Sequence, residues 1–264
     1  MTPPTSPTTR LTTLGGSAAG VGTGYGCAGS LVEHDGTRIV LDLGPDTLLE
    51  LRKHADMRAL DGIVISHLHL DHVLDLFAMR FALAYAPPRL ERKVPLWVPP
   101  GGSAFLDGAG AAFVLGGEDA SFFGKVFEVR EYDPLATLAI GTLTIDFQRS
   151  DHPIPCWSMR VNVPGGRNLV YTADTADIER LVPFAAGAHV LLSEATLPET
   201  PPQGTPRPHI SAAEAGTLAR EIGASVLVLT HMWEENDPAE AVAQAQGVFG
   251  GDVIRAQPGV SVQW

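Results

Sequence analysis

Residues 62–72 of the chain are GIVISHLHLDH, and this stretch carries the clearest information about the fold. Its first part, residues 62–66, is a short apolar run rich in Ile and Val, which predicts a buried strand. Its second part, residues 66–72, places four candidate metal ligands where the strand would give way to a helix, namely His67, His69, Asp71 and His72. Groups spaced so closely at a strand-to-helix turn can point into one site.

The side chains in this stretch have the chemistry of a metal site. Imidazole and carboxylate groups are ligands that suit Zn²⁺ and similar divalent ions. His67 and His69 belong to the extended part and Asp71 to the helix start, so the cluster can serve two metal ions. A solvated loop with chance histidines is the alternative, and the spacing directly after a buried strand speaks against it. Asp71 could also simply cap amides at the helix start.

The pattern His-x-His-x-Asp-His after a short hydrophobic strand resembles the signature of the metallo-β-lactamase superfamily. Three downstream residues match further positions of that signature: His152 in SDHPIP, Asp174 in VYTADT and His231 in VLVLTH. The turn at 42–44, Asp-Leu-Gly, matches an element ahead of the motif.

The resemblance implies a ligand set for two divalent metal ions. One ion would be held by His67, His69 and His152. The other would be held by Asp71, His72 and His231. Asp174 would bridge the two. We expect Zn²⁺, with Mn²⁺ or Fe²⁺ as alternatives, and a hydroxide shared between the ions at neutral pH.

Short apolar runs alternate with helical patterns along the rest of the chain. Strands are predicted at 11–14, 29–34, 38–43, 62–66, 95–98, 125–131, 142–148, 157–163, 168–172, 189–193, 225–230 and 252–255. Helices are predicted at 46–55, 71–85, 103–114, 177–184, 211–222 and 238–248. Because the strands come in adjacent groups, the order favours two packed mixed sheets with outer helices over a doubly wound sheet. The resemblance implies the same mixed α/β architecture, a four-layer αββα sandwich.

Length and composition predict a folded chain. The 264 residues are 45% hydrophobic and 18% charged, which excludes wholesale disorder. Residues 1–9 are rich in Pro and Thr and lack the apolar segment of a secretory signal, so we expect a disordered tail and a single domain at 10–264. No apolar run approaches the roughly 18 residues that a spanning helix needs, so we expect no membrane partner and a cytoplasmic location.

Beyond the ligands, the chain resembles the ribonuclease Z-like branch of the superfamily in SEAT at 193–196 and PHISAAEAG at 208–216. In that branch a histidine that is not a ligand assists the leaving oxygen of a phosphodiester, and a glutamate orients it. The match gives these catalytic roles to His209 and Glu194, with Asp71 also counted as catalytic. A histidine is the commonest general acid near pH 7. A solvated loop imidazole is the alternative for His209.

Two features separate the chain from the tRNA-processing members of that branch. His152 and Asp174 are only 22 residues apart in the sequence, which leaves no room for the long tRNA-gripping arm of those members. With 18 basic and 30 acidic residues, the net charge is −12, which disfavours a large polyanionic partner. The chain resembles most closely the armless, cyclic-nucleotide phosphodiesterase-like set, whose relatives are commonly dimers, so we also expect a homodimer.

The leading functional hypothesis is a phosphodiesterase with two metal ions that acts on a small phosphodiester such as a cyclic nucleotide. A lactonase, esterase or arylsulfatase-like hydrolase of a small anionic or ester metabolite is the first alternative. Lactonases of the superfamily usually rely on a tyrosine near the bridging aspartate, and Tyr171 lies near Asp174 in the sequence. A ribonuclease Z-type RNA endonuclease is the second alternative.

A few other residues invite interpretation. The glycine-rich stretch at 15–29 matches neither a phosphate-binding P-loop nor a dinucleotide fingerprint, so a flexible loop beside the site is expected. Cys27 and Cys156 are most simply small buried residues. Trp157 and Trp233 are either core or pocket-wall residues, where a base could stack.

Overall fold

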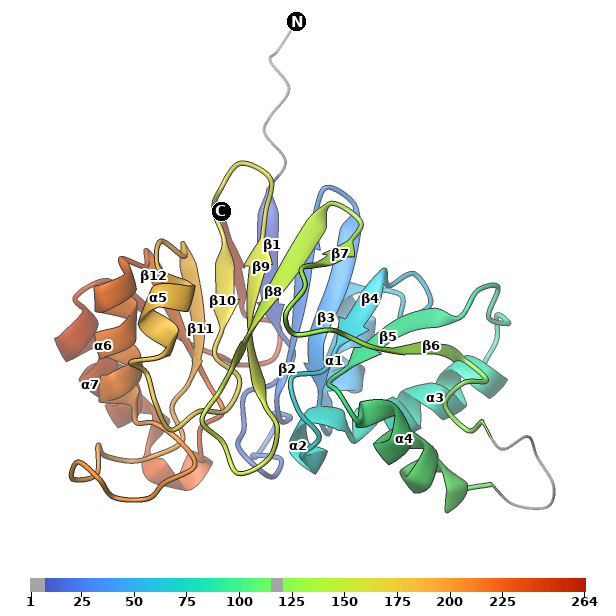
Figure 1. The fold of residues 1–264 in the computed structure, drawn as a ribbon, viewed down its shortest axis with the longest axis horizontal. Helices are drawn as coiled ribbons and strands as arrows, with labels where there is room; N and C mark the ends of the chain where they lie inside the picture. Colours follow the sequence, from blue (N-terminus) through green and yellow to red (C-terminus); the bar gives the residue numbers. More distant parts are fainter. Residues whose placement is uncertain (1–7, 115–120) are drawn as a thin grey trace, which may run out of the picture.

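Two seven-stranded sheets face each other in the computed structural model, which describes residues 8–114 and 121–264 (Figure 1). The first sheet has the spatial order β14 (Ser261–Gln263), β1 (Thr9–Thr13), β2 (Gly29–His34), β3 (Thr37–Leu43), β4 (Gly62–Val64), β5 (Val94–Val98) and β6 (Phe127–Glu131). The second has the order β13 (Asp252–Arg255), β12 (Val226–Thr230), β11 (Val190–Glu194), β10 (Leu169–Tyr171), β9 (Trp157–Asn162), β8 (Leu143–Arg149) and β7 (Leu138–Ile140).

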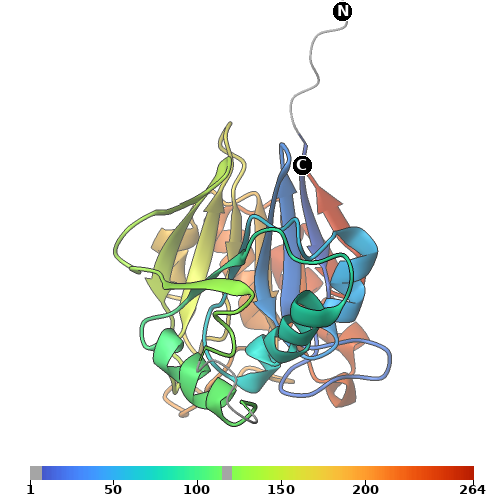
Figure 2. The same ribbon diagram turned by 90° about the vertical axis from the view of Figure 1, so that its right-hand side faces the viewer.

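Helices cover the outer face of each sheet, which gives four layers (Figures 1 and 2). The first sheet is covered by α1 (Thr47–His54), α2 (Leu70–Val73), α3 (Asp75–Tyr85) and α4 (Gly102–Ala111). The second is covered by α5 (Leu181–Ala185), α6 (Ala212–Ile222) and α7 (Pro238–Phe249), with a short 3-10 helix, η1 (Glu234–Asn236), before α7. The predicted αββα sandwich of two mixed sheets is confirmed. Among the residues that the structure describes, none of the helices is long and apolar enough to cross a membrane.

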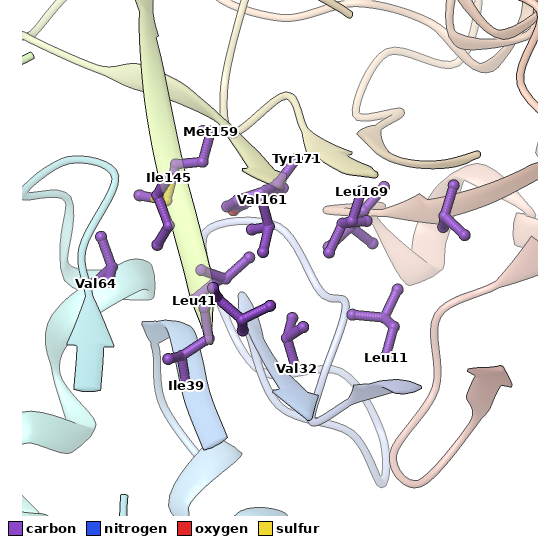
Figure 3. Close-up of a cluster of buried hydrophobic side chains, with 14 of the residues drawn as sticks. Leu11, Val32, Ile39, Leu41, Val64, Ile145, Met159, Val161, Leu169 and Tyr171 are labelled. Carbon is purple, nitrogen blue, oxygen red and sulfur yellow. The ribbon is translucent and has the colours of Figure 1, made fainter. Parts of the chain in front are cut away.

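Strand β3 is apolar on both faces because helices cover one face of its sheet and the second sheet covers the other. In β3, Ile39 and Leu41 belong to the core between the sheets, whereas Val40 packs with the helices outside. Ile145 and Val161 of the second sheet join the same inter-sheet cluster (Figure 3). The run in β3 therefore lacks the apolar–polar alternation of a half-exposed strand, and its Val, Ile and Leu content identifies it instead, whereas β8 and β9 keep the alternation.

The direction of the strands sets the position of the site. Strands β3, β4, β5 and β6 run parallel to one another, as do β10, β11, β12 and β13. Strand β8 is antiparallel to β9, which is antiparallel to β10, so β8 and β10 point the same way. The segments that follow β4, β8, β10 and β12 carry the candidate ligands. All of them therefore leave the sandwich at the edge where α2 lies, the lower edge in Figure 1.

Most predicted elements are present, with four differences. The helix predicted at 71–85 divides at Leu74 into α2 and α3. The helix predicted at 177–184 begins only at Leu181, because Asp177 accepts a hydrogen bond from the amide of Glu179 and fixes a turn there. The short strands β7 and β14 are additional. Of the predicted tail, residues 1–7 lie outside the described part of the chain, and Thr9 begins β1.

Gly44 allows the loop after β3 to approach α2 closely. A Cβ atom at this position would overlap the carbonyl oxygen of Asp71. We expect Gly44→Ala to displace α2 and destabilise the fold by about 3 kcal/mol, at the upper end for overpacking. Thermal unfolding and metal content measure the effect. Gly108→Ala is the control because its Cβ would meet open space within α4, and equal behaviour of the two variants would contradict the expectation.

Candidate metal centre

Three histidines from two sheets meet at the first group of candidate ligands. The Nδ1 atom of His69 lies 3.1 Å from Nε2 of His67 and 3.1 Å from Nε2 of His152. An oxygen of Asp174 lies 3.6 Å from Nε2 of His67. The four ligand atoms are within 4.8 Å of one another, so one cation could contact all of them.

The second group lies directly beside the first. An oxygen of Asp71 lies 3.0 Å from Nε2 of His231 and 3.6 Å from Nε2 of His72. The carboxylate of Asp174 reaches this group as well, with 3.5 Å to Nε2 of His72 and 3.5 Å to Nε2 of His231. The structure thus brings all seven predicted ligand residues together, and it places Asp174 between the two groups.

The hydrogen bonds around the histidines fix which nitrogen faces the centre. Nδ1 of His72 donates to Asp42 over 2.8 Å, and Nδ1 of His152 donates to the carbonyl oxygen of Pro208 over 3.1 Å. Nδ1 of His231 donates to the hydroxyl of Thr196 over 2.8 Å. Each bond leaves Nε2 with a free lone pair toward the centre, as a metal-ligating histidine requires.

Two buried atoms without hydrogen-bond partners indicate that the centre needs positive charge. Nε2 of His72 and Oδ1 of Asp174 have no hydrogen-bond partner among residues 8–114 and 121–264, although they lie 3.5 Å apart. A neutral His72 that donates from Nδ1 to Asp42 turns a lone pair toward Oδ1 of Asp174. This buried pair of atoms therefore needs a positive charge beside it, from a metal ion or from a proton on His72. The donor set of imidazoles and carboxylates therefore fits divalent metal ions.

The electrostatics of the site show the same demand for positive charge. Burial lowers the pKa of His72, but the carboxylates of Asp174 and Asp42 outweigh this and raise it well above its usual range. Burial, followed by the charge of His72, lowers the pKa of His67. Burial raises the pKa of Asp174, and the histidines His231 and His72 more than reverse this effect. The carboxylate of Asp174 thus stays ionised.

Asp42 orients His72 from below the centre. Its fully buried carboxylate accepts hydrogen bonds from the amide and hydroxyl of Ser66, from Nδ1 of His72 and from the hydroxyl of Tyr171. The sequence predicted Asp42 only as part of a turn. Its spacing ahead of the histidine motif is the signal that could have indicated a supporting role, since ligand histidines commonly donate to a carboxylate.

Two strand ends near the site adopt left-handed backbone conformations. Ala173, directly before Asp174, has φ of 49°, and His231 has φ of 52°. Residues other than glycine reach this region at a cost of about 1–3 kcal/mol, and such positions concentrate at functional sites. Both turns redirect the chain as it leaves β10 and β12, so that Asp174 and His231 face the centre.

His209 and Glu194 lie beside the two ligand groups. Nδ1 of His209 donates to Glu194 over 3.1 Å, and its ring centre lies 5.3 Å from that of His231 and 5.5 Å from that of His152. Glu194 is fully buried, and it also accepts hydrogen bonds from the amide of Thr175 and the hydroxyl of Thr196. The structure therefore places both predicted catalytic residues at the centre.

The surroundings of His209 favour its charged form. Burial lowers its pKa, but the hydrogen bond to Glu194 and the charges of Glu194 and Asp174 outweigh this, so the pKa is raised. His209 also forms a possible ligand group with Asp174 and His231. Because its Nδ1 is bonded to Glu194, only Nε2 remains free for either role.

Thr196 is a residue that the sequence did not single out. Its hydroxyl donates to Glu194 over 2.7 Å and accepts from Nδ1 of His231. Thr196 therefore links Glu194, which holds His209, to the candidate metal ligand His231. Its place in SEAT, two residues after Glu194, was the available signal.

The tyrosine, cysteine and tryptophan residues considered in the sequence differ in how far they are buried. Tyr171 is buried and its hydroxyl is bonded to Asp42, so it does not face the space beside the ligands. Burial and the charge of Asp71 raise the pKa of Cys27 to about 12, so its thiol stays protonated. Cys156 and Trp157 are buried, and burial raises the pKa of Cys156. Trp233 is 38% exposed.

The glycine-rich segment is packed against the site. The amide of Ala19 donates to Asp71 over 2.9 Å, and the amide of Thr23 donates to Glu234 over 2.7 Å. A Cβ at Gly15 or Gly26 would overlap neighbouring backbone. The prediction of a loop beside the site is confirmed, and these contacts show that the segment supports Asp71.

The fold and the site define a metallo-hydrolase, and the comparisons with known proteins identify its family. A family described as the β-lactamase superfamily domain matches residues 37–232. The chain therefore belongs to the metallo-β-lactamase superfamily.

Individual relatives cover nearly the whole chain. The uncharacterized protein ML1173 of Mycobacterium leprae is 33% identical, with 93% of this chain and 85% of the relative covered. The ribonuclease Z of Bradyrhizobium diazoefficiens is 30% identical, with 93% and 97% covered. The crystal structure of the metallo-β-lactamase fold protein YhfI from Bacillus subtilis, 25% identical, covers 98% of this chain and 100% of that protein with a TM-score of 0.84.

Substituting Asp174 tests whether it belongs to both metal sites. Because its carboxylate contacts both ligand groups, we expect Asp174→Ala to abolish activity and remove most bound metal. Metal content by mass spectrometry checks this. Asp177→Ala, in the same loop but outside both ligand groups, is the control. Two ions retained in Asp174→Ala would contradict the bridging position.

Substituting Asp42 tests the support of His72. Asp42→Asn keeps the shape but removes the carboxylate that holds Nδ1 of His72. We expect metal affinity to fall about 10- to 100-fold, as for other residues that support metal ligands. Competition with a chelator measures the affinity, and an unchanged affinity would show that His72 needs no such support.

Proposed function

We propose that the protein is a phosphodiesterase that hydrolyses a small phosphodiester, such as a cyclic nucleotide, with two divalent metal ions. His67, His69 and His152 would hold one ion. Asp71, His72 and His231 would hold the other, with Asp174 shared. The observation that carries the proposal is the hydrogen-bonded pair of His209 and Glu194 beside these ligands.

The chain's own residues explain how a leaving oxygen could be protonated. Glu194 fixes the imidazole of His209 through Nδ1, so Nε2 is the nitrogen that can deliver a proton. The partly exposed position of His209 lets it meet an incoming substrate. Divalent ions in the site would lower the pKa of water and stabilise charge on phosphoryl oxygens. Asp71, supported by the amide of Ala19, would act as a ligand and an electrostatic partner of this step.

The surroundings of Tyr171 weigh against the first alternative. A lactonase that relies on a tyrosine near the bridging aspartate needs a hydroxyl open to the substrate. The hydroxyl of Tyr171 is buried and donates to Asp42 over 2.8 Å. An esterase or arylsulfatase that uses His209 in the same way stays compatible with the site.

The ribonuclease alternative has support from the relative named ribonuclease Z. The alignment with that protein spans 297 positions, more than the 264 residues of this chain, so the relative carries segments that this chain lacks. Between His152 and Asp174 the structure contains only β9, β10 and their connecting turn. Together with the net charge of −12, this favours a small substrate over tRNA.

The proposal also includes the identity of the metal, the cellular location and the oligomeric state. Zn²⁺ is the first candidate metal, with Mn²⁺ or Fe²⁺ as alternatives, because imidazole and carboxylate ligands accept all three. A cytoplasmic location and a homodimer stay predictions.

Substituting His209 tests its role as the general acid. We expect His209→Ala to keep both metal ions but to slow hydrolysis of alkyl phosphodiesters about 100-fold. A bis-nitrophenyl phosphate, whose leaving group needs no proton, should be affected far less. Equal losses on both substrates would contradict the role, and loss of metal would show that His209 is a ligand. His54→Ala, a histidine bonded to Glu50 on α1, is the control.

A hydrolysis panel with Zn²⁺ or Mn²⁺ tests the substrate class. It contains cyclic AMP, bis-nitrophenyl phosphate, a nitrophenyl sulfate, a homoserine lactone and precursor tRNA. We expect turnover of the first two compounds to exceed that of the others. A preference for the sulfate, the lactone or the tRNA would replace the proposal with the corresponding alternative.

A further inference from the structure

A cavity of about 670 Å³ lies where α3 ends and where β5 and β6 begin. Four cationic side chains line it, and Glu91 is the one carboxylate among its lining residues in the described part of the chain. The cations are Arg89, Arg92, Lys93 and Lys125. Because acidic residues outnumber basic ones by 30 to 18 in the whole chain, the cavity has the opposite charge balance from the rest of the protein.

The loop that carries these cations is fixed to the body of the fold. The guanidinium of Arg58 donates to the carbonyl oxygens of Ala86 over 3.0 Å and Pro88 over 3.1 Å. Arg92 donates to the carbonyl oxygen of Leu60 over 2.9 Å. These bonds leave the loop little freedom to collapse into the cavity, so the cavity is preformed.

Three of the cations have no ion-pair partner within the part of the chain that the structure describes. Arg89, Lys93 and Lys125 are exposed and form no ion pair with any carboxylate in residues 8–114 and 121–264. Like charges that line one cavity repel one another, and a bound anion would relieve that repulsion. The cavity is therefore built to attract negative charge.

An aromatic ring borders the same cavity. Tyr85 is 58% exposed, and Nζ of Lys125 lies 5.6 Å from its ring centre. The hydroxyl of Tyr85 accepts a hydrogen bond from Arg80 over 3.4 Å, which holds the ring in place. A ligand that combines a phosphate with a flat ring could use the cations and the tyrosine together. The volume lies within the usual range for small-molecule sites, about 300–1,000 Å³.

The cavity is separate from the metal centre. Strands β4, β5 and β6 are parallel, the candidate ligand His67 follows the carboxyl end of β4, and the cavity lies at the amino ends of β5 and β6. A strand of five residues spans about 16 Å, so the two sites lie at opposite ends of the parallel strands of the first sheet.

We propose that this cavity is a second binding site, for a nucleotide, with the phosphate among Arg89, Lys93 and Lys125 and the base against Tyr85. The proposal does not depend on the substrate of the metal centre. It assigns the basic residues of this acidic chain a binding role that the catalytic site does not explain.

Calorimetric titration of the metal-loaded protein with AMP tests the proposal. We expect the double variant Lys93→Glu, Lys125→Glu to weaken binding at the cavity at least about tenfold, while hydrolysis of bis-nitrophenyl phosphate stays unchanged. Arg52→Glu, a charge reversal of an exposed arginine on α1, is the matched control and should bind AMP normally. AMP binding that the double variant leaves intact, including binding at the metal centre alone, would overturn the proposal.

Two further ligands separate the contributions of phosphate and base. Inorganic phosphate should bind more weakly than AMP, and adenosine should not bind measurably at the cavity. Tyr85→Ala should reduce the preference for AMP over inorganic phosphate. Equal affinity for AMP and inorganic phosphate would show a general anion site and overturn the assignment to nucleotides.

Discussion

The buried carboxylate of Asp42 is the interaction on which the arrangement of the site depends. It lies in β3 of the first sheet, and it accepts a hydrogen bond from Tyr171 of β10 in the second sheet. It also holds Ser66 after β4 and His72 in α2. One side chain thus ties together both sheets, the histidine motif and the helix that carries two ligands. A buried carboxylate is stable only when such donors surround it, so the ties are mutual.

The same principle explains why the centre needs metal ions. Asp71 and Asp174 add two further buried carboxylates within a few ångströms of the histidines. The donors around Asp42 satisfy that residue, but Oδ1 of Asp174 and Nε2 of His72 have no hydrogen-bond partner within residues 8–114 and 121–264. The fold therefore holds negative charge and lone pairs that protein groups alone do not balance. A centre that binds cations can also attract a small anionic substrate to an acidic protein.

The sequence predicts the fold class, and it points to four of the candidate ligands because those signals are local. His67, His69, Asp71 and His72 are close in the sequence, and the apolar runs around them mark buried strands. The roles of Asp42 and Thr196 are not predictable in this way, since they arise from contacts between residues 30 and 35 positions apart in the sequence. Strand β14 was missed because its three residues are stabilised by pairing with β1 at the far end of the chain.

The hydroxyl of Thr196 connects the proposed acid to the metal centre. This hydroxyl has one proton and two acceptors within reach, Glu194 at 2.7 Å and the carbonyl oxygen of His231 at 2.8 Å, and the carboxylate is the stronger acceptor. With the proton donated, the hydroxyl oxygen accepts the proton on Nδ1 of His231. The carboxylate of Glu194 also accepts a hydrogen bond from Nδ1 of His209. The orientation of the proposed acid and that of a metal ligand are therefore set by one continuous chain of hydrogen bonds. Loss of the charge on Glu194 would disturb both residues, so the acid and the metal centre form one unit and are not independent parts.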